Sequence, residues 1–352
     1  MVRKKLAIIM AASLALALAV SLIVPVATAP QPLAAAGQQS PRELPVLTLP
    51  AGLSGESSFA GQSPGWPPGA PWWTPGPPPW APSANKWAVV IGIADYQEPA
   101  TDLWHPDENA KEMAKALFTK YGFPAQNIKL LLNEQATAAA IVGAITWLAA
   151  MEDDDSTVVF FFSGHGFNVT DAEALAAGAD FDVEWDGMDE GIVSYDLVPL
   201  TDWLLAYEFS TFESQKFALV FDCCNSGGMF DSWLDAGGNP TPDPELGAIA
   251  VDLQAPGRVI CSACKADQVA WDWPSRGNTL FGYYFIDQGI LRGKANGALT
   301  GKKDGKVSME EALAYAQPFV LAASLALQDV YPDIDTTSEP QIYDGFAGEL
   351  VP

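Results

Sequence analysis

Two short apolar runs, each ending at a reactive side chain, constrain the fold of this chain more than any other feature. The first run, residues 157–162, leads into Ser163-Gly164-His165-Gly166, and the second, residues 217–222, leads into Cys223-Cys224. Runs of this length, rich in β-branched and aromatic residues, are typical of buried strands. Open α/β sheets place their chemistry at the carboxyl ends of such strands. The sequence therefore predicts a sheet with a histidine and a thiol at one edge.

The rest of the chain alternates strand and helix patterns, which favours a mostly parallel sheet with helices on both faces. Strands are expected at 87–93, 127–132, 157–162, 217–222, 258–262 and 340–344. Helices are expected near 107–120, 137–150, 199–211, 278–289 and 308–328. Ser308 and Glu311 have the spacing of a capping box at the start of the last helix.

A cysteine becomes a nucleophile when a base or its surroundings favour the thiolate, and imidazole is the usual partner. The chain has only 2 histidines, so a histidine set between glycines after a strand is a specific signal. The competing interpretation is that the adjacent thiols are core residues, since a free cysteine packs as a small apolar side chain.

The SGHG motif at 163–166 and the DCCNSG motif at 222–227 resemble those of caspase-like cysteine peptidases, closest to prokaryotic metacaspase-like proteins. The resemblance extends over much of residues 86–346. It implies an α/β fold, a caspase-like three-layer sandwich with a mostly parallel six-stranded sheet. It also implies a Cys-His dyad, with Cys224 as nucleophile and His165 as general acid and base. The backbone N–H groups of Gly166 and Cys224 would form the oxyanion hole.

In the family resembled, an acid two residues before the nucleophile lines the pocket for the substrate side chain. Asp222 holds that position, which implies cleavage after Arg or Lys in protein or peptide substrates. Two departures stand out. Asn225 replaces the usual histidine after the nucleophile, and Asn109 stands where the family has a second acid, so basic specificity would rest mainly on Asp222.

An acidic stretch follows the histidine motif, and it contains five carboxylates around a Gly turn. Hard oxygen ligands in this arrangement suit calcium, and metacaspases have a similar acidic segment. The candidate metal ligands are Asp182, Glu184, Asp186, Asp189 and Glu190. The alternative is a solvated acidic loop. No organic cofactor is expected.

The chain is strongly acidic, with 43 acids and 18 bases giving a net charge of −25. Phosphate binding requires a basic footprint, so nucleic acid is not expected as a partner. From Glu134 to Glu213 there is no Lys or Arg, and this field around His165 should attract cationic substrates or metal ions.

Three segments are expected. Residues 1–36, with a basic start and a long apolar run, predict a signal peptide or an N-terminal membrane anchor. Residues 37–85 are rich in Pro, Gly, Ser and Trp and predict a linker or pro-segment. Residues 86–352 would form the peptidase domain. The protein is then secreted or anchored at the cell surface, with membrane contact only through the first segment if it is uncleaved.

The 4 cysteines allow further interpretations. In an exported protein of this fold, neighbouring strands would bring Cys223 near Cys261 or Cys264, which predicts a disulfide. Zinc binding by all four fits their spacing poorly. The alternative function is a catalytically silent, surface-anchored binding protein on a caspase-like scaffold.

Overall fold

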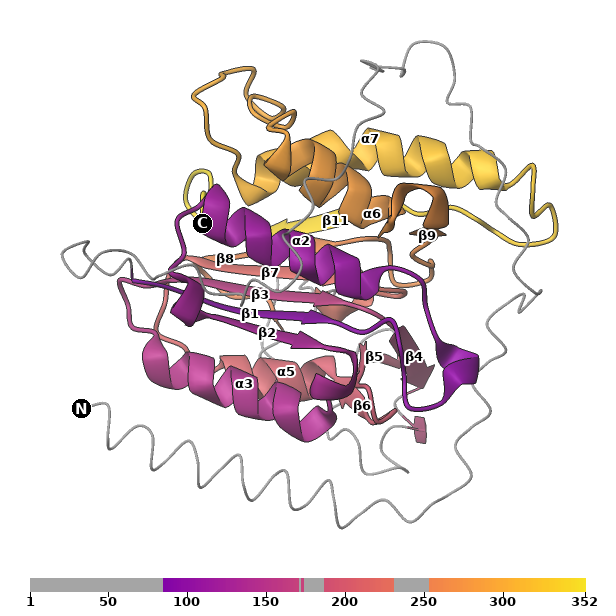
Figure 1. Ribbon diagram of the computed structural model, residues 1–352, viewed down its shortest axis with the longest axis horizontal. Coiled ribbons are helices and arrows are strands. Elements are labelled where there is room, and N and C mark those ends of the chain that lie inside the picture. The colour runs from indigo at the N-terminus through magenta and orange to yellow at the C-terminus, as the bar shows by residue number, and fades with distance from the viewer. Residues whose placement is uncertain (1–84, 171, 174–186, 231–252) are drawn as a thin grey trace, which may run out of the picture.

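The computed structural model describes residues 85–170, 172–173, 187–230 and 253–352 (Figure 1). The expected N-terminal signal or anchor and all but the end of the expected linker therefore lie outside the described residues. None of the described helices combines the length and apolar character needed to cross a membrane.

A six-stranded sheet organises the molecule, with the order β11-β8-β7-β3-β1-β2. Its strands are β1 (Lys86–Gly92), β2 (Ile128–Leu132), β3 (Thr157–Ser163), β7 (Phe217–Asp222), β8 (Arg258–Ser262) and β11 (Gln341–Asp344). Every pair is parallel except β11 with β8, which is antiparallel. The expectation of a six-stranded, mostly parallel sheet is confirmed, and each strand falls close to its predicted range.

Helices cover both faces of this sheet (Figure 1). One face carries α2 (Pro106–Thr119), α7 (Met309–Leu327) and a helix that begins as α6 (Leu280–Gly282) and continues in π-helical turns as η7 (Tyr283–Leu291). The other face carries α3 (Ala138–Met151) and α5 (Asp202–Phe209). The three layers of the expected sandwich are therefore present.

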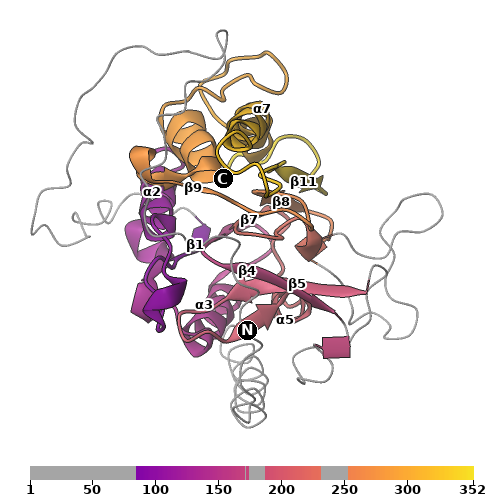
Figure 2. The same cartoon turned by 90° about the vertical axis from the view of Figure 1, so that its right-hand side faces the viewer.

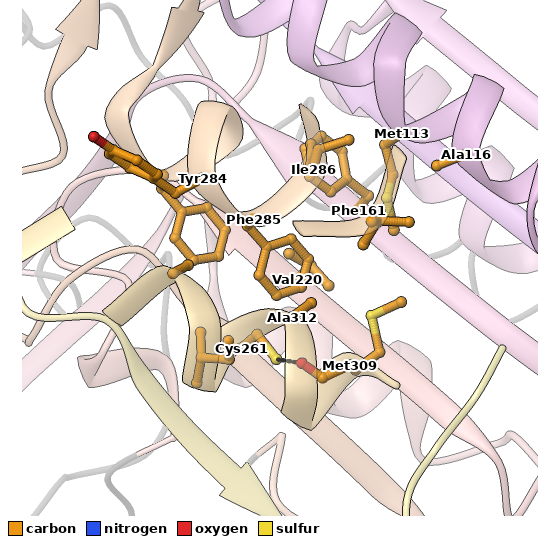
Figure 3. Packing of buried hydrophobic residues seen from close by; sticks show 14 of the residues in the cluster. Met113, Ala116, Phe161, Val220, Cys261, Tyr284, Phe285, Ile286, Met309 and Ala312 are labelled. Carbon is orange, nitrogen blue, oxygen red and sulfur yellow. Dashed lines mark hydrogen bonds between the residues drawn. The ribbon is translucent and has the colours of Figure 1, made fainter. Parts of the chain in front are cut away.

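The four central strands, β1, β3, β7 and β8, are buried on both faces, because their successive side chains point to opposite sides of the sheet and helices cover both sides. Phe161 and Val220 pack with Phe285 on the side of α2 and α7 (Figure 3). Phe160 and Phe221 pack with Phe209 on the side of α3 and α5. This double burial explains why the strands read as uninterrupted apolar runs.

Two expected helices begin later than predicted. Residues 199–201 form the short strand β6 (Pro199–Thr201), and residues 278–279 form β10 (Asn278–Thr279). The Thr201 and Thr279 side chains then accept from Leu204 N–H and Gly282 N–H, which caps the helices that follow. The capping box of Ser308 and Glu311 at the start of α7 is confirmed.

A second, three-stranded antiparallel sheet was not predicted. It consists of β4 (Gly166–Thr170), β5 (Met188–Val193) and β6, and it follows directly from the end of β3 (Figure 2). The strand β9 (Asp272–Trp273) pairs with β10 in a separate two-stranded antiparallel ribbon. The described 3₁₀ turns are η1 (Pro99–Thr101), η2 (Ala125–Asn127), η3 (Asn133–Gln135), η4 (Gly228–Phe230) and η6 (Pro274–Arg276).

Candidate active site

The histidine and cysteine motifs meet because their strands are neighbours. β3 and β7 run in parallel with Ser163 opposite Asp222, so both chains leave the sheet at the same level. A Cβ atom built on Gly166 would lie only 2.0 Å from the Cys224 carbonyl oxygen. Only glycine permits this approach, so the glycine after His165 is what allows the two turns to touch.

The two adjacent cysteines occupy different environments. Cys223 is buried in the core shared with α3 and α5, whereas Cys224 is partly exposed. Asn225 holds a left-handed backbone with φ 57°, a conformation that Asn tolerates better than most residues. Its N–H donates to the Gln268 carbonyl at 3.0 Å and its side chain donates to the Ala266 carbonyl at 2.6 Å. The residue that replaces the family's histidine therefore ties the turn to the loop after β8.

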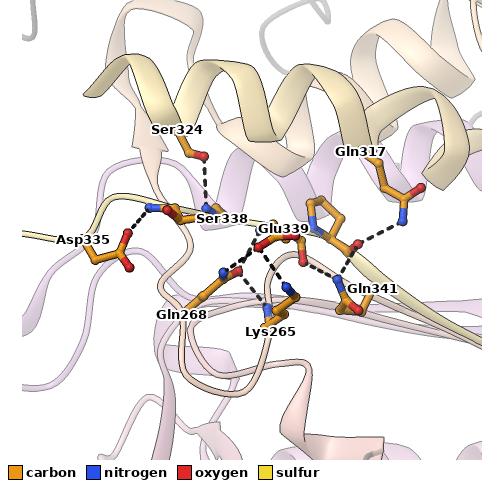
Figure 4. Close-up of polar contacts among 10 residues, drawn as sticks. Lys265, Gln268, Gln317, Ser324, Asp335, Ser338, Glu339 and Gln341 are labelled. Atoms are coloured by element: carbon orange, nitrogen blue, oxygen red, sulfur yellow. Dashed lines mark hydrogen bonds and ion pairs between the residues drawn. The ribbon is translucent and has the colours of Figure 1, made fainter. Parts of the chain in front are cut away.

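That loop is held in turn by the segment before β11 (Figure 4). Lys265 Nζ and the Gln268 amide both donate to Glu339 Oε1, at 2.8 Å and 3.2 Å. The Gln268 Oε1 accepts from the backbone N–H groups of Lys265 and Glu339. The loop therefore fixes the position of the Cys224 turn from the side opposite His165.

The imidazole of His165 has a defined proton arrangement. Its Nε2 lies 2.7 Å from the Thr101 carbonyl oxygen, which can only accept, so Nε2 carries the proton and Nδ1 is basic. The backbone N–H of His165 donates to the Tyr96 hydroxyl at 2.7 Å, and the centroids of the His165 and Tyr96 rings are 4.8 Å apart. Burial lowers the pKa of His165, which favours the neutral imidazole that a general base requires.

The Cys224 thiol donates to the Ala270 carbonyl at 3.9 Å. Burial is the main effect that raises its pKa, and the negative charges of Asp272 and Asp222 add to it. The resting thiol is therefore protonated, and its activation requires a proton acceptor. The backbone N–H of Cys224 interacts with its own thiol and partly offsets this increase in pKa. The oxyanion role of the Cys224 and Gly166 N–H groups stays a prediction.

Asp222 is the last residue of β7, directly before the two cysteines, and it is 1% exposed. Its Oδ2 accepts from the Asn109 amide, the Ser163 hydroxyl and the Thr279 hydroxyl, each at 2.8 Å. Its Oδ1 is buried and has no hydrogen-bond partner among the described residues. Burial raises the pKa of Asp222 to about 6, and these hydrogen bonds oppose the increase.

Sequence reasoning missed a second carboxylate, Asp272 of β9. Its Oδ2 accepts from the Trp104 N–H at 3.1 Å, and its Oδ1 is buried without a hydrogen-bond partner in the described part of the chain. Burial raises its pKa to about 6 and the charge of Asp222 adds to the increase, whereas the backbone N–H groups of Trp104 and His105 oppose it. An acid within the Trp271-Asp272-Trp273 run was the available signal, but a two-residue strand gives no recognisable period.

The candidate calcium ligands are only partly described. Asp182, Glu184 and Asp186 lie outside the described residues, whereas Asp189 and Glu190 are buried on β5. The Glu190 carboxyl lies beside Gly228 of the nucleophile turn, where an added Cβ would be 2.6 Å from its Oε2. Within the described ranges no three His, Cys, Asp or Glu side chains form a metal-binding group. Calcium binding therefore stays a prediction.

The expected disulfide is wrong, because all four cysteines are free thiols. Cys261 points to the α7 side of the sheet, where its thiol faces the Met309 carbonyl at 4.0 Å (Figure 3). Cys223 packs on the opposite side, so the sheet separates the two side chains. Cys264 lies near Cys223, and its thiol donates to the Cys223 carbonyl at 3.4 Å. The placement of Cys261 also excludes a zinc site made by all four.

A six-stranded sheet that presents a histidine turn and a cysteine turn at neighbouring strand ends defines the class of caspase-like proteins. The sequence profile of the family described as "Caspase domain" matches residues 85–314, and the chain belongs to this family of cysteine peptidases.

Among curated proteins, Metacaspase-4 of Arabidopsis thaliana is 30% identical over 164 residues, which cover 44% of this chain and 36% of that protein. The chain thus spans about a third of that relative's length. Among solved structures, a protein of Geobacter sulfurreducens is 17% identical and covers 76% of this chain and 97% of its own, with a TM-score of 0.47. Caspase-1 of Spodoptera frugiperda is 14% identical and covers 76% and 90%, with a TM-score of 0.44.

Proposed function

We propose that this chain is a cysteine endopeptidase that cleaves proteins or peptides after Arg or Lys. The observation that carries the proposal is the contact of the His165 and Cys224 turns beside a buried carboxylate, Asp222, with an unfilled acceptor oxygen. A buried acceptor without a partner is costly, and a cationic side chain would satisfy it.

The proposed reaction proceeds by acyl transfer. The Cys224 thiol gives its proton to His165 Nδ1 as the sulfur attacks the substrate carbonyl carbon. His165 then protonates the leaving amine, and the C–N bond breaks to leave a thioester. A water molecule gives a proton to the same nitrogen as it attacks the thioester, and the thiol is regenerated. The Nε2–H···O=C bond to Thr101 holds the ring in the tautomer that these steps need.

Calcium is proposed as a stimulating ion, held by carboxylates of the acidic stretch, Asp182, Glu184, Asp186, Asp189 and Glu190. The position of Glu190 against Gly228 supports this, because an ion bound there would act on the turn that carries Cys224. The ion would supply charge neutralisation in an acidic environment. We also propose an extracytoplasmic location, from the basic and apolar character of residues 1–36.

Matched reporter peptides that differ only in Arg, Lys or Asp before the scissile bond test the proposal. The wild-type chain should cleave the Arg and Lys reporters and spare the Asp reporter. Cys224→Ala should lower kcat by roughly 10⁴-fold or more. Absence of cleavage of all three, with and without calcium, would favour the silent scaffold instead.

A further inference from the structure

A second buried carboxylate, Asp272, lies beside Asp222 at the candidate active site. Asp272 comes from β9, on the side of the loop after β8, whereas Asp222 ends β7. Thr279 links the two groups, because it pairs with Asp272 across the β9–β10 ribbon and its hydroxyl donates to Asp222 Oδ2 at 2.8 Å. The charge of Asp222 also raises the pKa of Asp272. Each has one oxygen held by the protein and one buried oxygen without a partner among the described residues.

Asn109 holds the other side of Asp222 in a fixed orientation. Its Nδ2 donates to Asp222 Oδ2 and to Thr279 Oγ1, both at 2.8 Å. Its Oδ1 accepts from the Asn278 amide at 3.0 Å, and the same amide nitrogen donates to Glu112 Oε2 at 3.0 Å. Because each atom of the Asn109 amide has a partner of the correct kind, the group cannot flip without losing several bonds. Asn109 is therefore a neutral donor aimed at Asp222.

We propose that Asp272 is a second specificity-determining residue, that Asn109 is a neutral positioning residue, and that together they select Arg over Lys. The proposal rests on the proposed peptidase function and deepens it. In this proposal Asp272 of β9 supplies the second acid that is missing at position 109.

The arrangement favours Arg for two reasons. The guanidinium group presents several N–H donors in a rigid fork, so one cation can satisfy the Oδ1 atoms of both Asp222 and Asp272. It is also more weakly hydrated than an ammonium group, so it loses less when it enters a site whose acceptor oxygens are already shielded from water. Because position 109 carries a neutral amide and not an acid, Asp222 Oδ2 has three hydrogen-bond donors around it. These donors lower the pKa of Asp222 and favour its ionised form.

The test measures kcat/KM for reporters with Arg, Lys and citrulline before the scissile bond, citrulline being the uncharged counterpart of Arg. The wild-type chain should prefer Arg to Lys by about tenfold or more. Asp272→Asn keeps an oxygen for the Trp104 N–H, and it should lower the Arg-to-citrulline ratio by about 30-fold or more. Asp272→Glu should lie between the two. The control, Asp335→Asn, removes an exposed charge elsewhere and should leave the ratio unchanged.

These outcomes distinguish a failure of the role of Asp272 from a failure of the proposed peptidase function. Equal losses for Arg and citrulline in Asp272→Asn would make Asp272 a structural residue, and an unchanged ratio would remove it from the pocket. Either result overturns the inference while the wild-type rate upholds the peptidase. If the wild-type chain cleaves none of the reporters, the proposed function itself fails.

Asn109→Asp tests the positioning role. An acid there would face Asp222 Oδ2 directly, and two close carboxylates share a proton. The pH at which the Arg-to-citrulline ratio reaches half its maximum should therefore move upward. The other titratable groups whose pKa values respond to the charge of Asp222 are Cys223, Cys224 and Asp272. An unmoved midpoint would contradict the role of Asn109.

Discussion

At the scale of single residues, the exposures of the two adjacent thiols separate their roles. Cys224→Ala should abolish hydrolysis because the partly exposed thiol is the proposed nucleophile. Cys223→Ala should retain most of the rate, and it should cost about 1 kcal/mol of stability because it removes a buried side chain. Hydrolysis rates and thermal unfolding of the two variants check this. Full activity in Cys224→Ala would contradict the assignment.

The pocket acids also predict a dependence on pH. The pKa values of Asp222 and Asp272 are both raised to about 6, so both carboxyl groups become protonated as the pH falls through that value. Since a cationic side chain binds the ionised forms, KM for the Arg reporter should rise between about pH 7 and 5.

The citrulline reporter is the control for this effect. Protonation of His165 slows both reporters equally, so the ratio of their kcat/KM values isolates the pocket. A ratio that stays flat from pH 7 to 5 would mean that the two carboxylates do not contact the substrate side chain.

The candidate residues differ in how far the sequence could identify them. Cys224, His165 and Asp222 follow long apolar strands, so their shared edge could be inferred from pattern alone. Asp272 could not, because it sits in a two-residue strand and approaches Asp222 only through tertiary packing. The role of Asn109 was also hidden, since a hydrogen-bond network has no sequence period.

At the scale of elements, the sequence predicted all six strands of the main sheet and missed the short strands outside it. β1, β3, β7 and β8 are continuous apolar runs. β4 and β6 are short and partly exposed, and β5 is interrupted by two acids and a glycine. The expected bridge from Cys223 to Cys261 or Cys264 is absent. For Cys261 the reason is related: strand adjacency was inferred correctly, but the side chains of Cys223 and Cys261 point to opposite faces.

The acidic strand β5 carries the calcium prediction. Chelation should lower the rate, and calcium at about 0.1–1 mM should restore it. Glu190→Gln should weaken the calcium response, because this carboxyl lies against the nucleophile turn. Rates measured over a series of free calcium concentrations check this, with Asp335→Asn as the matched loss of an exposed carboxylate. If a chelator leaves the rate unchanged, the acidic stretch has no role in activation.

At the scale of the whole molecule, the distribution of basic residues limits where the proposed enzyme could cut another copy of itself. There is no Lys or Arg from 217 to 257, whereas Lys302 and Lys303 lie in a fully exposed irregular loop. Among described residues, no backbone–backbone hydrogen bond involves positions 302–306. Such a loop is a favoured site of proteolysis.

This loop and the active site lie at opposite ends of the parallel strands. Lys86, the first residue of β1, donates to the Tyr121 carbonyl, and the Tyr121 hydroxyl donates to the carbonyl of Val307, which directly follows the loop. His165 and Cys224 instead follow the carboxyl ends of β3 and β7. Cleavage should therefore occur between two molecules. Wild-type enzyme mixed with an excess of the Cys224→Ala chain should cut that chain after Lys302 or Lys303, as read by mass spectrometry. A substrate chain that also carries Lys302→Gln and Lys303→Gln should resist, and equal cutting of both chains would contradict the prediction.

The most direct test of the central claim is covalent labelling with a thiol-reactive peptide that ends in Arg, followed by intact mass measurement and peptide mapping. The account predicts one label per chain, on Cys224, with none from a matched peptide that ends in Asp. Labelling should disappear in Cys224→Ala and persist in Cys223→Ala. A label on another cysteine, equal labelling by the two peptides, or no label at all would contradict a Cys224–His165 peptidase with a pocket for basic side chains.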